Sequence, residues 1–304
     1  MNVLDFMLSS AATLGEIHPQ TRRYRAQTKL LAEDVPYTDS GLVAHRLDVH
    51  APRVSNGKLP VLFHVHGGGF RILSKNSHRS VARRYAAAGY LVVNVNYRLT
   101  PEGQYPAALE DVCQALLWTL KNAESYGGDL SRLAYAGESA GANLVLCAAI
   151  LGCFERPEPW AKAVFDANPS PAAVLPACGL FEVHHAARYL DDDKLPRWLR
   201  ARIKVICDGY LGDEQASSLA SPLHLLESDE EPKRPLPPMF AVCGDIDPVL
   251  DDSLRLGKAL KQRGNAGSVE LYRGSHHAFH VFFSANAQRA WADQLAFLER
   301  HLGG

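Results

Sequence analysis

Strand-like and helix-like segments alternate along most of this 304-residue chain. The run LPVLFHVH, residues 59–66, is nearly all apolar apart from its histidines, as a strand buried on both faces should be. Further strands are predicted at residues 90–97, 132–137, 237–244 and 267–274, and helices at residues 77–89, 105–127, 139–154, 251–264 and 286–302. Strands that alternate with helical crossovers predict an α/β fold with a mostly parallel sheet covered by helices on both faces.

The N-terminal part of the chain departs from this alternation. Residues 1 to about 34 carry apolar side chains, among them Val3, Leu4 and Met7, at the spacing of an amphipathic helix. Strand-like runs follow at residues 35–38 and 42–51, and we expect them to add an antiparallel edge to the sheet.

A second departure lies at residues 181–235, where apolar and aromatic fragments alternate with charged and proline-rich loops. We predict that this insertion forms a helical lid rather than a separate domain. Residues 1–304 are therefore expected to form a single domain.

The overall composition excludes several classes of function. The net charge of −1, without a charged tail, provides no electrostatic reason to bind nucleic acid or an anionic membrane. The six cysteines form no CxxC pair, so neither a disulfide framework nor a zinc site is expected. No run of eighteen apolar residues occurs, and the N-terminal stretch lacks the basic start of a signal peptide. We expect a cytoplasmic protein without a nucleic-acid or membrane partner.

The sequence GESAG, residues 137–141, lies between a predicted strand and a predicted helix, which is the context of a nucleophile elbow. Ser139 would occupy a sharp turn that lifts its Oγ above the sheet, and Gly137 and Gly141 would let neighbouring backbone approach. The helix that follows would direct its N-terminal amides at the reaction centre. In the simpler alternative Ser139 only caps the helix, but a cap does not need both glycines.

A triple glycine follows the buried strand in the sequence HGGG, residues 66–69. Glycines expose backbone N–H groups that can stabilise a developing oxyanion. We predict Gly67 and Gly68 as donors, together with Ala140, which follows the serine. Gly69 is expected to keep the turn open, and His66 to shape the loop by hydrogen bonding.

Three motifs together resemble the hormone-sensitive lipase family of α/β-hydrolases, the bacterial family IV carboxylesterases. They are HGGGF, NYRLTPEGQYPAALEDV and GGDLSRLAYAGESAGANL, and the resemblance runs from about residue 59 to residue 301. It implies the α/β-hydrolase fold with a helical cap made by residues 1 to about 34 and about 181–235. Many members have Asp before the serine where this chain has Glu138, which we expect to brace neighbouring loops.

The acid is expected between the serine and the base along the chain. The segment FAVCGDIDPVLDDS offers Asp245, Asp247, Asp251 and Asp252. The family pattern has its acid directly before proline, which implies Asp247 and leaves Asp245 as a rival. Asp251 and Asp252 begin a predicted helix, where acidic residues are expected in any case.

The base is expected after the last strand, in the segment GSHHAFH. The family pattern G-x-x-H-x-F, counted from Gly274, implies His277, followed by Ala278 where glycine is usual. His277 would take the proton of Ser139, and Asp247 would hold the tautomer of His277. His276 would then lie at the surface or against the cap, as would His280.

These residues predict a serine carboxylesterase that acts on small short- to medium-chain acyl esters through an acyl-enzyme and needs no cofactor. An amidase or deacetylase could use the same triad. A metal site made by His276, His277 and His280 with Asp247 is a less favoured alternative. A non-catalytic binding protein is disfavoured because the base is present, and a homodimer is compatible with the sequence.

Overall fold

The computed structural model describes residues 18–191, 195–213 and 218–303. Within them, one six-stranded sheet has the order β1-β2-β4-β3-β5-β6. Its strands are β1 (Thr28–Pro36), β2 (Arg46–Pro52), β3 (Leu59–Val65), β4 (Leu91–Val95), β5 (Gly128–Glu138) and β6 (Ala173–Ala177). β2 pairs antiparallel with β1 and β4, whereas β3 pairs parallel with β4 and β5, and β5 pairs parallel with β6.

Two further strands, β7 (Phe240–Gly244) and β8 (Ser268–Tyr272), pair parallel with each other as a two-stranded sheet, and a parallel bridge between Val174 and Met239 places this pair beside β6. The amide of Val174 in β6 donates to Pro238 O, and the amide of Cys178 donates to Val242 O, each at 2.9 Å. The mostly parallel sheet with an antiparallel edge, predicted from the sequence, is therefore confirmed.

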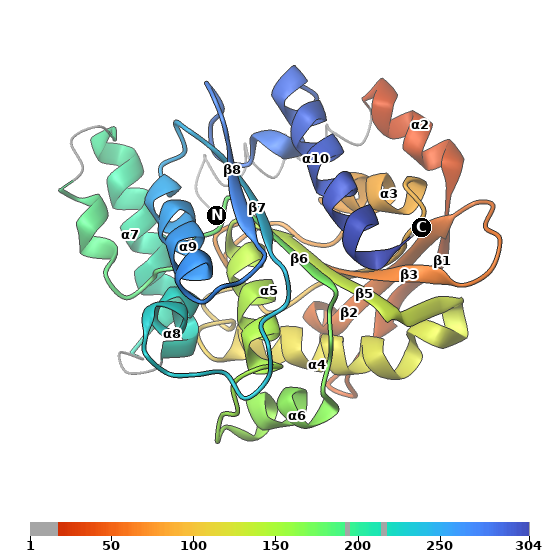
Figure 1. Ribbon diagram of the computed structural model, residues 1–304, viewed down its shortest axis with the longest axis horizontal. Coiled ribbons are helices and arrows are strands. Elements are labelled where there is room, and N and C mark those ends of the chain that lie inside the picture. Colours follow the sequence, from red (N-terminus) through yellow and green to blue (C-terminus); the bar gives the residue numbers. More distant parts are fainter. Residues whose placement is uncertain (1–17, 192–194, 214–217, 304) are drawn as a thin grey trace.

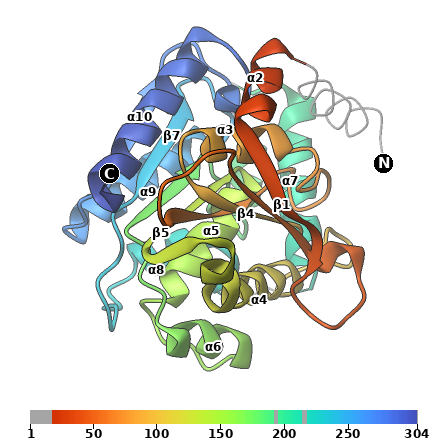
Figure 2. The same cartoon turned by 90° about the vertical axis from the view of Figure 1, so that its right-hand side faces the viewer.

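Helices cover both faces of the sheet (Figures 1 and 2). One face carries α2 (Pro19–Gln27), α3 (Arg79–Ala87) and α10 (Ala285–Leu302). The other carries α4 (Ala107–Asn122), α5 (Ala140–Leu151), α6 (Pro159–Ala167) and α9 (Leu250–Gln262).

The period of two along the strands separates the two cores. On β3, Val61, Phe63 and Val65 belong to the cluster with α4 and α5, whereas Leu62 belongs to the cluster with α3 and α10. All four side chains are fully buried, which is why this strand reads as a continuous apolar run.

The prediction of a helix up to residue 34 is wrong for its last part. Helix α2 ends at Gln27 and β1 begins at Thr28, with Lys29 opposite Ala51 and Leu30 opposite His50 of β2. Pairing with the neighbouring strand outweighs the local helical spacing. The apolar face that begins at Val3 lies outside the described residues.

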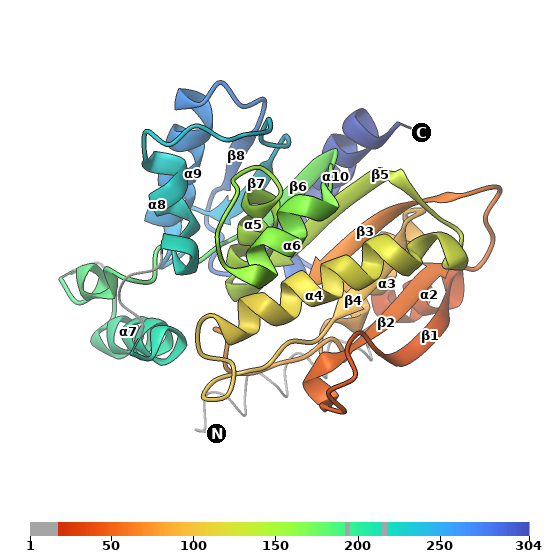
Figure 3. The same ribbon diagram turned by 90° about the horizontal axis from the view of Figure 1, so that it is seen from below.

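The insertion at residues 181–235 contains α7 (Arg197–Leu211) and α8 (Pro222–Glu227). α7 lies at one margin of the molecule (Figures 1 and 3). The ring of Tyr210 on α7 stacks on Phe70 with 3.7 Å between centroids, and Tyr210 O accepts the amide of Tyr105 at 2.7 Å. The insertion is therefore attached to the loop that follows β3.

Two findings bear on the composition. All six cysteines are buried and free. Among the described residues, no helix has the length and apolar character that a bilayer crossing needs.

Candidate active site

Ser139 occupies a strained turn between β5 and α5. Its backbone has φ 55° and ψ −118°, and its amide donates to Ala177 O at 2.9 Å. A Cβ on Gly137 would lie 2.5 Å from Gly141 O, and a Cβ on Gly141 would lie 2.2 Å from Val65 O. Only glycine fits at either position, so the close backbone contacts of this turn explain both glycines of the GESAG motif.

Three predicted residues from distant parts of the sequence form one hydrogen-bonded chain. His277 Nε2 lies 2.9 Å from Ser139 Oγ, and His277 Nδ1 lies 2.9 Å from each carboxylate oxygen of Asp247. Ser139 follows β5, Asp247 follows β7 and His277 follows β8, so the three meet at the carboxyl ends of parallel strands.

The groups around Ser139, His277 and Asp247 favour one arrangement of the protons on the His277 ring. Burial works to lower the pKa of His277, but the charge and hydrogen bond of Asp247 outweigh it and raise that pKa above its ordinary value. Burial works to raise the pKa of Asp247, which His277 and the amide of Val249 nevertheless hold below its ordinary value. An ionised Asp247 accepts the Nδ1 proton, which leaves the Nε2 lone pair facing the serine hydroxyl.

The other acidic candidates do not reach His277 in the described structure. Asp245 Oδ1 accepts the amide of Gly274 at 2.6 Å and braces the turn after β8. Asp251 is exposed in the first turn of α9, while Asp252 is buried there and accepts the amide of Phe181.

The three histidines of GSHHAFH have different surroundings. His276 is exposed and its ring Nδ1 lies 3.1 Å from His277 O. His280 is buried, with Nδ1 4.0 Å from Cys178 Sγ. The prediction of a surface or cap position therefore fails for His280, because its ring is buried beside Cys178. Ala278 has φ 54°, a left-handed conformation that favours glycine.

The glycine loop requires a correction to the predicted oxyanion donors. The amide of Gly67 donates to Glu138 Oε1 at 2.6 Å, so it is already occupied. Within the described part of the chain, no hydrogen bond starts from the amides of Gly68, Gly69 or Ala140. The amides left for an oxyanion are those of Gly68, Gly69 and Ala140.

Glu138 holds the back of this loop, as the sequence suggested. Besides Gly67, its Oε1 meets His78 Nε2 at 2.6 Å, and its Oε2 lies 3.5 Å from His64 Nε2. Burial opposes ionisation, but the facing imidazoles of His78 and His64 hold the pKa of Glu138 well below its ordinary value. His78 carries no motif in the sequence, and only the fold brings it to Glu138.

His66 acts on the same loop from the other side. Its Nδ1 lies 2.7 Å from Gly67 O, and its ring stacks on Tyr97 with 4.4 Å between centroids. Burial lowers the pKa of His66 to about 3, so the ring is neutral near pH 7. A neutral, packed ring fits the predicted role of shaping the loop.

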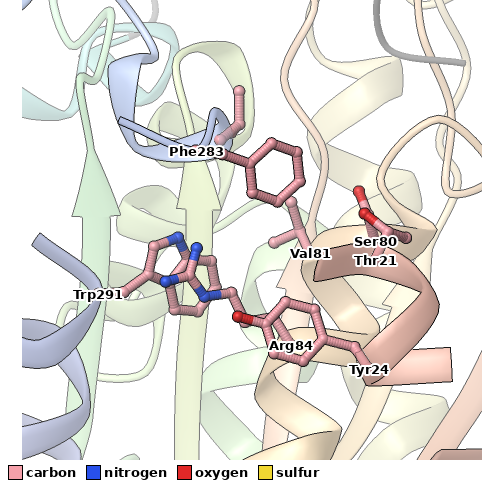
Figure 4. A pocket seen from close by; sticks show the side chains of 8 residues that line it. Thr21, Tyr24, Ser80, Val81, Arg84, Phe283 and Trp291 are labelled. Atoms are coloured by element: carbon pink, nitrogen blue, oxygen red, sulfur yellow. The ribbon is translucent and has the colours of Figure 1, made fainter. Parts of the chain in front are cut away.

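A shallow pocket lies away from the serine, between α2, α3 and α10 (Figure 4). The guanidinium of Arg84 lies 4.2 Å from the ring centre of Trp291 and 5.7 Å from that of Tyr24. Neither Ser139 nor His277 lines this pocket, so it does not belong to the serine site.

Potential metal ligands cluster at two places among the described residues. One group consists of Cys178, Asp247 and His277. Asp247 and His277 already bind one another, and a hydrogen bond with Cys243 together with burial raises the pKa of the Cys178 thiol. The second group, Glu182, His184 and His224, lies within the insertion. Neither group contains His276 or His280.

Comparisons with known proteins identify the family to which this fold belongs. A family model described as the α/β-hydrolase fold matches residues 62–281. The carboxylesterase NlhH of Mycobacterium tuberculosis is 33% identical over 236 residues, which make up 76% of this chain and 69% of that protein.

Solved structures share the fold. A bacterial heroin esterase has a TM-score of 0.76 at 24% identity, covering 91% of this chain and 86% of its own. An esterase of the bacterial hormone-sensitive lipase family has a TM-score of 0.70 at 24% identity, covering 100% of this chain and 99% of its own. The chain therefore belongs to the α/β-hydrolase family, and the resemblance to the hormone-sensitive lipase group predicted from its motifs is confirmed.

Proposed function

We propose that the chain is a serine carboxylesterase with Ser139 as nucleophile, His277 as base and Asp247 as acid. The observation that carries this proposal is the hydrogen-bonded chain from Ser139 Oγ through the imidazole to the carboxylate, with 2.9 Å at each step. The names of the relatives, carboxylesterase and esterase, support ester hydrolysis over other uses of the fold.

The proposed reaction has two halves. His277 Nε2 takes the Ser139 proton as Oγ attacks the ester carbonyl carbon, and it then protonates the leaving alcohol. Water, activated by the same nitrogen, hydrolyses the acyl-enzyme and releases the carboxylic acid. Asp247 stabilises the imidazolium that forms in each half.

The negative oxygen of each tetrahedral intermediate is proposed to accept hydrogen bonds from Gly68, Gly69 and Ala140. Ala140 begins α5, so its amide also lies at the positive end of the helix dipole. One such donor is typically worth about 10²- to 10³-fold in kcat. Gly67 is replaced in this role because Glu138 occupies its amide.

The insertion is proposed to cover the acyl side of the site. A Cβ on Gly69 would lie 3.0 Å from Ile206 Cδ1, so α7 lies directly against the glycine loop. An apolar side chain at this distance favours small acyl groups of short to medium length. A panel of p-nitrophenyl esters with increasing acyl length measures this preference.

Replacement of the nucleophile tests the proposal. Ser139→Ala and His277→Ala should each lower kcat for p-nitrophenyl butyrate by roughly 10⁴-fold or more, because each removes a member of the triad. His276→Ala is the matched control and should retain activity, since its exposed ring does not face the serine. Near-normal turnover by Ser139→Ala would exclude the proposed mechanism.

Two expectations need separate measurements. The triad is equally suited to amides, so matched p-nitroanilides should be assayed beside the esters, and faster anilide hydrolysis would favour an amidase.

Light scattering in solution decides whether the 33.3-kDa chain is a monomer or a homodimer.

A further inference from the structure

A second cluster of chemically competent side chains lies apart from Ser139. It consists of Glu182, His184 and His224, whose potential ligand atoms all lie within 4.8 Å of one another. Glu182 and His184 come from the segment that leaves β6, and His224 lies on α8, shortly before the chain returns to β7. The cluster therefore joins the two ends of the insertion.

Glu182 is fully buried and fixed by hydrogen bonds on one side only. Its Oε1 accepts the amides of His184 and His185, at 3.0 and 3.3 Å, and the hydroxyl of Ser221 at 3.1 Å. Its Oε2 is in direct contact with His224 Nε2, an ion pair that forms when this imidazole carries a second proton and that a metal ion between the two atoms would replace. A buried carboxylate oxygen of this kind needs a cation or a proton to balance it.

The hydrogen bonds of Ser221 fix the tautomer of His184. The hydroxyl proton of Ser221 goes to Glu182 Oε1, so Ser221 Oγ can only accept at its contact with His184 Nδ1, 2.7 Å away. Neutral His184 therefore carries its proton on Nδ1 and its lone pair on Nε2. Ligating histidines in metalloproteins are commonly oriented by such a bond from the other ring nitrogen.

We propose that Glu182, His184 and His224 bind one divalent transition-metal ion of the Zn²⁺ class, with water completing a four-coordinate site. Two imidazoles and a carboxylate form a ligand set that suits Zn²⁺. Ligand atoms around tetrahedral Zn²⁺ lie roughly 3.3 Å apart, given Zn–N distances of about 2.0–2.1 Å. The three ligand atoms lie within 4.8 Å of one another, so binding of the ion requires side-chain rotations that adjust these separations to about 3.3 Å.

The neighbouring arginine balances the charge of Glu182 only in part. Arg255 Nη2 forms a long ion pair with Glu182 Oε2 at 3.6 Å, without a hydrogen bond. It also forms a two-point ion pair with Glu227, at 2.8 and 2.6 Å. His185 Nδ1 lies 3.5 Å from Glu182 Oε2 on a mostly exposed ring, so this histidine can replace the water ligand.

The role of this ion is structural. It would connect the segment after β6, which contacts the serine elbow through Leu180 N and Ser139 O at 3.4 Å, to α8 at the other end of the insertion. None of the ligands belongs to the proposed triad. The inference is therefore independent of the proposed esterase function, and either can fail without the other.

Metal uptake by the untagged full chain tests the inference. After treatment with chelator, wild type should bind one equivalent of Zn²⁺ in calorimetric titration and give the visible spectrum of four-coordinate Co²⁺ on cobalt addition. His184→Ala and His224→Ala should each lose this binding, while His301→Ala, a substitution on α10, should keep it. Ser221→Ala should weaken it by roughly 10- to 100-fold, since it removes the bond that orients His184.

Three outcomes would overturn the inference. Wild type could take up no Zn²⁺, the ligand variants could bind it as tightly as wild type, or His301→Ala could lose it as well. Circular dichroism and the esterase rate identify any variant that fails to fold. The wild-type titration and cobalt spectrum decide the question even if both ligand variants misfold.

Discussion

At the scale of single residues, Glu138 links the serine elbow to the glycine loop. It directly precedes Ser139 in the chain, and its carboxylate accepts the amide of Gly67 and meets His78. The sequence suggested a bracing role, but it also assigned Gly67 as an oxyanion donor. The two roles exclude each other because one amide proton cannot serve both acceptors.

Removal of this carboxylate should destabilise the fold strongly. Glu138→Ala leaves the Gly67 amide and the raised-pKa His78 without their buried partner, at a cost of about 3–5 kcal/mol in the free energy of unfolding. Urea unfolding at pH 7 measures this cost. Glu124→Ala, which removes an exposed ion pair with Lys58, should change it by less than about 1 kcal/mol. Equal effects of the two substitutions would contradict the bracing role.

The same argument fixes a pH dependence. The pKa of Glu138 is lower in the folded than in the unfolded chain, so its contribution is present above the unfolded pKa. That contribution is lost as the pH falls through the folded pKa. The difference in stability between wild type and Glu138→Ala should therefore shrink under acid conditions.

Asp247 should control the acid limb of the pH–rate profile. It raises the pKa of His277 above 6.5, so kcat/KM in wild type should fall off below a midpoint above that value. Asp247→Asn leaves burial as the main influence and should move the midpoint down, with a loss of roughly 10⁴-fold in kcat. Asp245→Asn should leave the midpoint in place, because Asp245 contacts Gly274 instead. A midpoint that moves with Asp245 and not with Asp247 would reassign the acid.

At the scale of elements, the sequence predicts best where one segment determines its own environment. β3 is buried on both faces and is visible as an apolar run. By contrast, β1 is mostly exposed and depends on pairing with β2, so its local pattern resembles a helix. The sequence predicts no helix or strand in residues 155–180. The structure has α6 there, and also the five-residue strand β6, which includes Pro176.

The same distinction between local and long-range determinants explains which residues of the site the sequence predicts. Ser139 and the triple glycine are recognisable because the turn and the loop impose residue types locally. The choice of Asp247 and His277 depended on the family pattern, because several acidic residues and histidines lie close together in the sequence. His78 was missed, because its contact with Glu138 joins α3's start to β5's end and exists only in the folded chain.

Helix α7 should set the acyl-length preference. Ile206 lies against Gly69, so Ile206→Ala opens space above the loop and should shift kcat/KM in favour of longer acyl chains, by roughly 10-fold or more per added methylene accommodated. Val205→Ala is the matched control, since Val205 is 52% exposed on the same helix. The ester panel measures the ratio for both variants. An unchanged preference in Ile206→Ala would mean that α7 does not border the acyl group.

At the scale of the whole molecule, the proposed catalytic site and the proposed metal site lie in different parts of the structure. The proposed triad sits at the carboxyl ends of β5, β7 and β8, whereas the proposed metal ligands lie where the insertion leaves and rejoins the sheet. An ion that binds only the folded chain stabilises it by about 2.7 kcal/mol when its concentration is 100 times the Kd.

This separation predicts that Zn²⁺ changes the melting temperature but not the rate of ester hydrolysis. The melting temperature of metal-free wild type should rise by roughly 4 °C at that concentration, because an unfolding entropy of about 2.1 cal/mol/K per residue gives about 1.6 °C per kcal/mol for a chain of 304 residues. The initial rate of ester hydrolysis at 25 °C should not change with Zn²⁺ or with chelator, because the ion contacts none of Ser139, His277 and Asp247. His184→Ala should lose the thermal shift and keep the rate. If chelator abolishes ester hydrolysis and Zn²⁺ restores it, the metal takes part in catalysis instead. If Zn²⁺ does not change the melting temperature, no metal ion connects the two ends of the insertion.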